Sequence, residues 1–93
     1  MLDKVKKALR ISKATFDDEV TDLINAAIAD LRLVGINVPE NVGSSGSPDD
    51  PLFVRAIILY CKANFGYIDG AERYRAAYDY LKCALSLAGG NDE

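Results

Sequence analysis

The sequence predicts an all-α protein. We expect a small four-helix domain with a long loop between the second and third helices and a central, apolar third helix. Apolar residues recur at helical spacing in four segments, and typical start and stop residues bound most of these segments. No alternating run predicts a strand of consequence, although residues 35–42 have room for a short extended piece. The length of 93 residues fits one domain, spanning residues 1–93.

The first helix is expected at residues 2–10, with Leu2, Val5 and Leu9 on one face. A helix this short needs tertiary packing to persist. Residues 1–13 carry five basic residues against one acid, a net charge of +4, which leaves −7 for the rest of a chain whose total is −3. A basic end of this kind indicates contact with nucleic acid or an acidic partner, or only a solvated helix face.

The second helix is expected at residues 16–34. Thr15 is the predicted N-cap, with Asp18 at the acidic position of a capping box, and Gly35 is the predicted stop. Acidic residues fill the first turn, where they favour the positive end of the helix dipole. The apolar stripe consists of Phe16, Val20, Leu23, Ile24, Ala27, Ile28, Leu31 and Val34.

Residues 36–50 are expected to form a flexible loop or, alternatively, an arm that binds a partner. Most of the segment from Gly43 onward is small and polar, so it offers few side chains to bury and much backbone freedom to lose. A connection of this length is uncommon in a compact domain.

The third helix is expected to begin with Asp50 as its cap and Pro51 as its first residue, and to stop at Gly66. Almost every direction around it is apolar, which is typical of a central helix. Arg55 and Lys62, seven residues apart, would then form its narrow exposed edge.

The fourth helix is expected to start at Asp69, with Glu72 at the capping-box position, and to end before a frayed tail at 89–93. One apolar face contains Ala71, Tyr74, Tyr78, Leu81 and Leu85, and a second contains Ala76, Tyr80, Cys83 and Leu87. The second face indicates either another neighbour within the domain or contact with a second copy of the protein.

The residues do not support catalysis. The chain has no histidine, and its two cysteines are too far apart for a zinc site; they are expected to be reduced and packed. We therefore expect no catalytic, cofactor-binding or metal site, and no enzyme activity. The longest apolar run, 56–61, is far shorter than the roughly 20 residues that span a membrane.

Several strings in this order and spacing resemble a known family. They are Leu9-Arg10-Ile11, then the runs 16–20 and 23–27, then Asp50-Pro51-Leu52, and then the runs 55–60, 62–67 and 85–87 with Tyr78 and Leu81-Lys82. Together they resemble the head–tail connector proteins of tailed phages, which also include DNA-packaging and head-completion adaptors. The resemblance covers residues 2–88.

The resemblance implies a subunit of a homo-oligomeric ring, dodecamer-like, below the portal protein of a phage or prophage. Such a ring extends the DNA channel, lets DNA pass without sequence specificity, and offers a docking surface to the tail or a stopper protein. It also implies a virion protein that is assembled in the bacterial cytoplasm, with no cofactor and no membrane association.

The candidate subunit or partner contacts are surface charges and the second apolar face of the fourth helix. They are Lys6, Lys7, Arg10, Asp18, Asp22, Arg55, Lys62, Tyr80 and Leu87. A ring of head-to-tail copies needs two different complementary patches, and the basic first helix and acidic second helix are candidates. Arg55 and Lys62 either meet a neighbouring subunit, face the DNA channel, or pair internally with acids.

Two other functions fit a small helical chain. A DNA-binding regulator needs a recognition helix with exposed basic or amide side chains. The third helix is too apolar for this role, and the fourth mixes Arg73 and Arg75 with Glu72 and Asp79. An adaptor that binds one partner protein through a helical surface is the other alternative.

Overall fold

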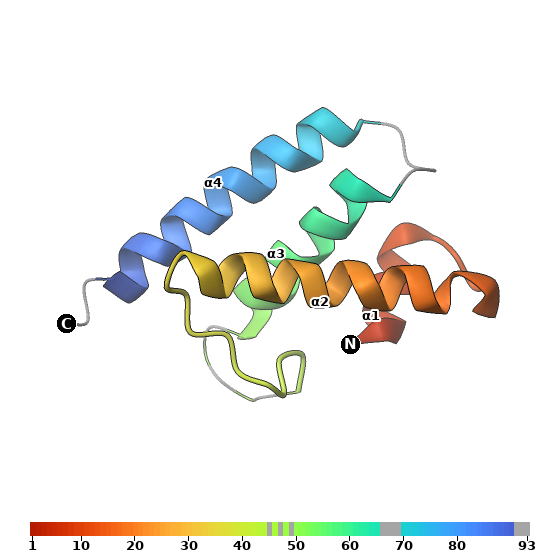
Figure 1. The fold of residues 1–93 in the computed structure, drawn as a ribbon, viewed down its shortest axis with the longest axis horizontal. Helices are drawn as coiled ribbons and strands as arrows, with labels where there is room; N and C mark the ends of the chain where they lie inside the picture. Colours follow the sequence, from red (N-terminus) through yellow and green to blue (C-terminus); the bar gives the residue numbers. More distant parts are fainter. Residues whose placement is uncertain (45, 47, 49, 66–69, 91–93) are drawn as a thin grey trace.

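The computed structural model describes residues 1–44, 46, 48, 50–65 and 70–90. Within these residues it contains four α-helices, one 3-10 turn and no strand, so the all-α prediction is confirmed. The elements are α1 (Leu2–Leu9), the turn η1 (Ala14–Phe16), α2 (Asp17–Leu33), α3 (Asp50–Asn64) and α4 (Ala71–Gly90). Figure 1 shows α3 in the middle, with α4 on one side of it and α1 and α2 on another.

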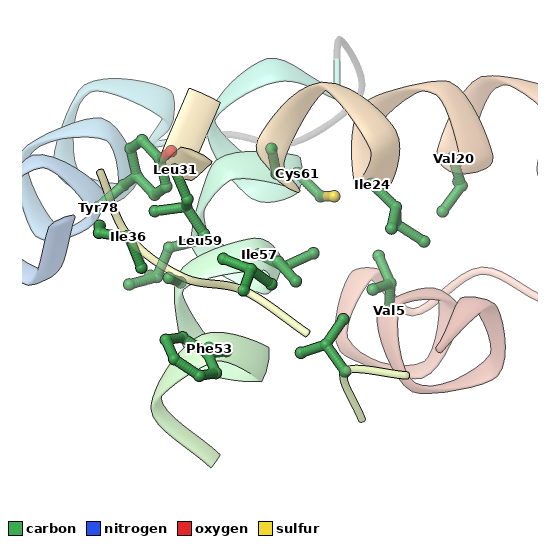
Figure 2. Packing of buried hydrophobic residues seen from close by; sticks show 14 of the residues in the cluster. Val5, Val20, Ile24, Leu31, Ile36, Phe53, Ile57, Leu59, Cys61 and Tyr78 are labelled. Atoms are coloured by element: carbon green, nitrogen blue, oxygen red, sulfur yellow. The ribbon is translucent and has the colours of Figure 1, made fainter. Parts of the chain in front are cut away.

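The third helix lies at the centre of the fold because its side chains are buried in several directions. It packs against α1, α2 and α4. Ala56, Ile57 and Cys61 are fully buried, and Phe53 and Leu59 are nearly so. Figure 2 shows the labelled residues of α3, which are Phe53, Ile57, Leu59 and Cys61, among side chains from α1, α2 and α4. Burying a side chain of the size of Ile57 contributes roughly 1.5–3 kcal/mol, so α3 supplies much of the stabilising core.

The first helix ends one residue earlier than predicted because Arg10 adopts a left-handed conformation (φ 62°). The Arg10 N–H donates to the Lys7 carbonyl (3.1 Å) and the Ile11 N–H to the Lys6 carbonyl (3.0 Å). This pair of bonds is a Schellman motif, which satisfies the carbonyls at the helix end. The turn sends the chain back toward α2.

The predicted Thr15 cap is wrong. Thr15 lies inside η1, and α2 begins at Asp17 without a side-chain cap. The η1 turn before α2 is held by packing instead, because the Phe16 ring meets the Phe65 ring edge-on with centroids 5.5 Å apart. An aromatic contact to the end of α3 therefore fixes the start of α2.

The predicted stop at Gly35 is confirmed, and its geometry directs the chain into the core. Gly35 has φ 90°, which a residue with a Cβ rarely adopts. Its N–H donates to the Arg32 carbonyl, and the Ile36 N–H donates to the Leu31 carbonyl (3.1 Å). Ile36 and Leu31 are both buried, which is the hydrophobic contact that accompanies a Schellman motif.

The loop after α2 is packed over its first half, which corrects the expectation of a flexible loop over 36–50. Ile36, Val38 and Val42 all belong to the buried core. The Arg32 guanidinium donates to the Val38 carbonyl at 2.8 Å and 3.3 Å. Residues 35–42 form no strand.

The loop is also tied to two helices at Gly43. The Gly43 N–H donates to Asp50 Oδ1 (2.8 Å), and Lys4 Nζ donates to the Gly43 carbonyl (2.8 Å). Asp50 was predicted as the cap before Pro51, but it is the first residue of α3, and its carboxylate binds the loop backbone. Flexibility or partner binding remains a prediction for the residues after Gly43.

The ends of α3 and α4 differ slightly from the predicted ones. The third helix ends at Asn64, and Phe65 is buried just after it. Gly66 and Asp69, the predicted stop and start, lie outside the described residues. The fourth helix continues through Gly90, so the frayed tail predicted from 89 is wrong at its first two residues; residues 91–93 lie outside the described part.

Two leucines on α2 test the assignment of the core. Leu31 is fully buried, whereas Leu33 is 83% exposed. We expect Leu31→Ala to lower the free energy of unfolding by about 2–5 kcal/mol, through lost burial and the cavity left behind. Leu33→Ala should change it by less than about 0.5 kcal/mol. Urea unfolding of dilute protein measures both, and equal effects would contradict this core.

Candidate interaction surfaces

The fourth helix presents an apolar face to solvent. We define the α4 outer stripe as Ala76, Tyr80, Cys83 and Leu87, all of which are exposed. Tyr80 is 76% exposed and Leu87 64%. The opposite face packs on the core through Tyr78 and Leu85, as predicted. Within the described residues no neighbour covers this second face, so the predicted packing partner within the domain is wrong. Contact of this face with a second copy of the protein stays a prediction.

The second helix also turns one face to solvent. We define the α2 outer stripe as Asp22, Ala26, Ala29 and Leu33, which are all exposed. Asp18, one turn earlier, is exposed too. The core face of this helix carries Val20, Ile24, Ala27 and Leu31. The outer stripe is thus acidic at its start, small in its middle and apolar at its end.

The basic residues of α1 do not form one free surface. The Lys6 ammonium binds Asp17 Oδ1 at 2.6 Å, and only 14% of the Lys6 side chain is exposed. Lys6 was predicted to point away from the core as a contact to another molecule, but it joins α1 to α2 within one subunit. Lys7 and Arg10 are exposed.

Arg55 and Lys62 have different surroundings. Arg55 is exposed, as predicted, whereas Lys62 is half-buried with its ammonium 5.1 Å from the centroid of the Tyr74 ring. Arg73 approaches the same ring at 5.6 Å. A cation over an aromatic face is stabilised by the ring quadrupole. Within the described residues, neither Arg55 nor Lys62 forms an ion pair with an acid, so their internal pairing is not found.

A polar groove of about 220 Å³ lies between α2, α3 and α4, and the sequence did not predict it. Asp30 Oδ2 accepts hydrogen bonds from the Tyr78 hydroxyl (2.5 Å) and Lys82 Nζ (3.1 Å). The Tyr78 ring meets the Tyr60 ring edge-on at 5.2 Å. The spacing of Tyr78 and Lys82, four residues apart on one helix, is the signal that both could reach one acid.

The groove network changes the pKa of two groups. The hydrogen bond from Tyr78 is the main cause that lowers the pKa of Asp30; Lys82 also lowers it, and burial partly opposes both. The pKa of the Tyr78 hydroxyl is raised, first by burial and then by the Asp30 carboxylate. This network ties α4 to α2, and a further contact, Ser86 Oγ to the Val34 carbonyl (3.4 Å), lies one turn beyond it.

The described residues contain no group of three or more potential metal ligands. Cys61 is buried, and burial raises the pKa of its thiol to about 12, which leaves it a poor nucleophile. Cys83 is exposed, so its predicted packing role is wrong. No helix in the described part of the chain is long and apolar enough to cross a membrane.

The model of a protein family described as "Phage connector protein" matches residues 1–92. The chain belongs to this family. The resemblance seen in the sequence is therefore confirmed. Neither a curated protein nor a solved structure matches the chain. Membership makes this connector a structural component of a phage virion that associates with other head or tail proteins.

The Asp30 network gives the connector a stability that depends on pH. Folding lowers the pKa of Asp30. Its contribution to the free energy of unfolding is therefore complete above pH 3.8, the ordinary carboxyl pKa, and is lost as the pH falls through the lower pKa of the folded state. At pH 7 we expect Asp30→Asn to reduce the free energy of unfolding by about 0.5–1.5 kcal/mol. The difference in the free energy of unfolding between Asp30→Asn and the unsubstituted chain should shrink toward pH 2.

Urea unfolding of dilute protein at several pH values measures this effect. Asp22→Asn, on the exposed stripe of the same helix, is the matched control and should change little at any pH. A difference for Asp30→Asn that stays constant with pH would contradict a charge-dependent role.

Proposed function

We propose that this connector assembles into a closed ring of identical subunits below the portal vertex. The ring extends the DNA channel of the head and offers a surface on which the tail or a stopper protein docks. The copy number follows the symmetry of the portal, as in a dodecamer-like ring. Membership of the phage connector family supports this role.

One observation carries the proposal most strongly: a single subunit exposes two different helix faces. A head-to-tail ring needs two unlike patches on each copy, whereas a two-fold dimer needs one patch that matches itself. The α2 and α4 outer stripes differ in charge and in side-chain size. Each ends in a large exposed apolar residue, Leu33 or Leu87, whose burial would favour association.

Charge supports passage of DNA rather than its retention. Tight binding to the phosphate backbone requires clustered positive charge, and the chain carries a formal net charge of −3. Lys7, Arg10 and Arg55 are exposed cations that could meet DNA, the portal or a neighbouring subunit. A channel lined by subunits that carry more acidic than basic residues would let DNA slide without sequence specificity.

The two alternatives are less well supported. A regulator needs an exposed recognition helix, and α3, which follows the long loop, is buried on most sides. A one-to-one adaptor would use one surface, whereas this subunit exposes two unlike ones. The family match favours the connector role over both.

The proposal is tested by absolute mass, measured by light scattering after gel filtration over a wide concentration range. We expect a closed oligomer of many subunits whose mass stays fixed once formed, either alone or after addition of the portal protein of the same phage. A portal protein from an unrelated phage is the matched control and should not induce assembly. A chain that remains a monomer or a plain dimer, and does not bind its portal, would contradict the proposal.

A further inference from the structure

We propose that the α4 outer stripe of one subunit packs lengthwise, in parallel, against the α2 outer stripe of the next. This inference rests on the proposed ring and names the two surfaces that form its repeated contact. The occupant of each exposed stripe is thus a second copy of this chain.

The two stripes have the same spacing. Asp22, Ala26, Ala29 and Leu33 are separated by four, three and four residues, and so are Ala76, Tyr80, Cys83 and Leu87. Each α4 residue therefore carries a number 54 higher than its α2 counterpart. At 1.5 Å per residue, each stripe is about 16 Å long. Two helices with matching ridges can pack along this length at an interaxial distance of about 8–10 Å.

Side-chain sizes are complementary in this alignment. The large Tyr80 ring faces the small Ala26, and the small Cys83 faces the small Ala29, where the two helices can approach closely. Leu87 faces Leu33, which buries two of the most exposed large apolar side chains of the subunit. Small residues let helix backbones approach, and alternating large and small residues fill the space between them.

The apolar ends of the two stripes favour the parallel direction, because Leu87 then lies against Leu33. In the same register Asp18 lies opposite Glu72 and Glu19 lies opposite Arg73, so one repulsive and one attractive pair meet at the start of the stripes and the charges contribute little. Antiparallel packing would place the apolar Leu87 against Asp22 and Leu33 against the small Ala76 instead.

Helix directions within the subunit agree with this geometry. Figure 1 shows α2 and α4 running in the same overall direction, and Asp30 meets Tyr78 and Lys82 while Val34 meets Ser86 further along both helices. Rotation about a ring axis along that direction preserves it, so α4 of one copy runs parallel to α2 of the next. Each copy uses both stripes, and the contact repeats until the ring closes.

A disulfide trap tests the register. Ala29→Cys places a thiol opposite the native Cys83 of the neighbouring copy, while Cys61 is buried and cannot compete. A disulfide forms only when the two Cβ atoms lie about 3.5–4.5 Å apart. Under a mild oxidant such as diamide, we expect a ladder of dimers, trimers and larger species on a non-reducing gel, which collapses to monomer on reduction.

Two variants control the trap. Ala14→Cys introduces a thiol at an exposed alanine outside both stripes and should give no ladder. Ala29→Cys combined with Cys83→Ser should give none either. Wild-type protein that forms only Cys83–Cys83 dimers would indicate two-fold pairing of α4 and would overturn the inference.

The mass measurement separates this inference from the proposed ring. An oligomer of many subunits in which Ala29→Cys gives no ladder overturns the α2–α4 contact but leaves the ring intact. A chain that stays monomeric with its portal, and gives no ladder at any concentration, contradicts both. A ladder specific to Ala29→Cys supports both.

Discussion

The burial of α3 is the constraint on which the rest of the fold depends. A chain of 93 residues can build one modest core, and α3 occupies its centre. Ala56, Ile57 and Cys61 are fully buried because α1, α2 and α4 each cover part of this helix. Each covering helix buries one face against α3, and the opposite faces of α2 and α4 stay exposed to solvent. The exposed stripes follow from the way the core is made.

The same constraint explains the polar contacts around the core. The α4 helix packs mainly on α3, and the contacts of Asp30 with Tyr78 and Lys82 fix its position relative to α2. The Lys6–Asp17 pair does the same for α1 and α2. These contacts use charges within the subunit, whereas the outer stripes consist of apolar and small side chains apart from Asp22. A neighbour that covers them would add stability to the folded subunit.

Much of the fold could be predicted from the sequence because helix periodicity and helix ends are local signals. Gly35 marked the end of α2, and the apolar residues around α3 marked its central place. The errors arise where distant residues decide the outcome. Thr15 does not cap α2 because Phe16 packs on Phe65, and this contact is invisible in the local sequence.

The candidate surfaces were predictable only in part, for the same reason. The spacing of Tyr80 and Leu87 showed a second apolar face, but only the three-dimensional arrangement shows that the described chain leaves it uncovered. Conversely, the position of Lys6 on the helix wheel predicted a surface charge, but the reversal of the chain after α1 brings it to Asp17. Val38 and Val42 were expected to lie in a flexible loop, but both belong to the buried core, which the local sequence does not show.

The most direct test of the account is the reactivity of the native Cys83 thiol toward a maleimide, before and after assembly on the portal. The unsubstituted protein can be used because Cys61 is buried and serves as an internal control. If the α4 outer stripe is a subunit contact, we expect rapid labelling of Cys83 in the free subunit and strong protection in the assembled ring. Equal labelling in both states would show that the outer face of α4 is not a subunit contact, and would contradict the account.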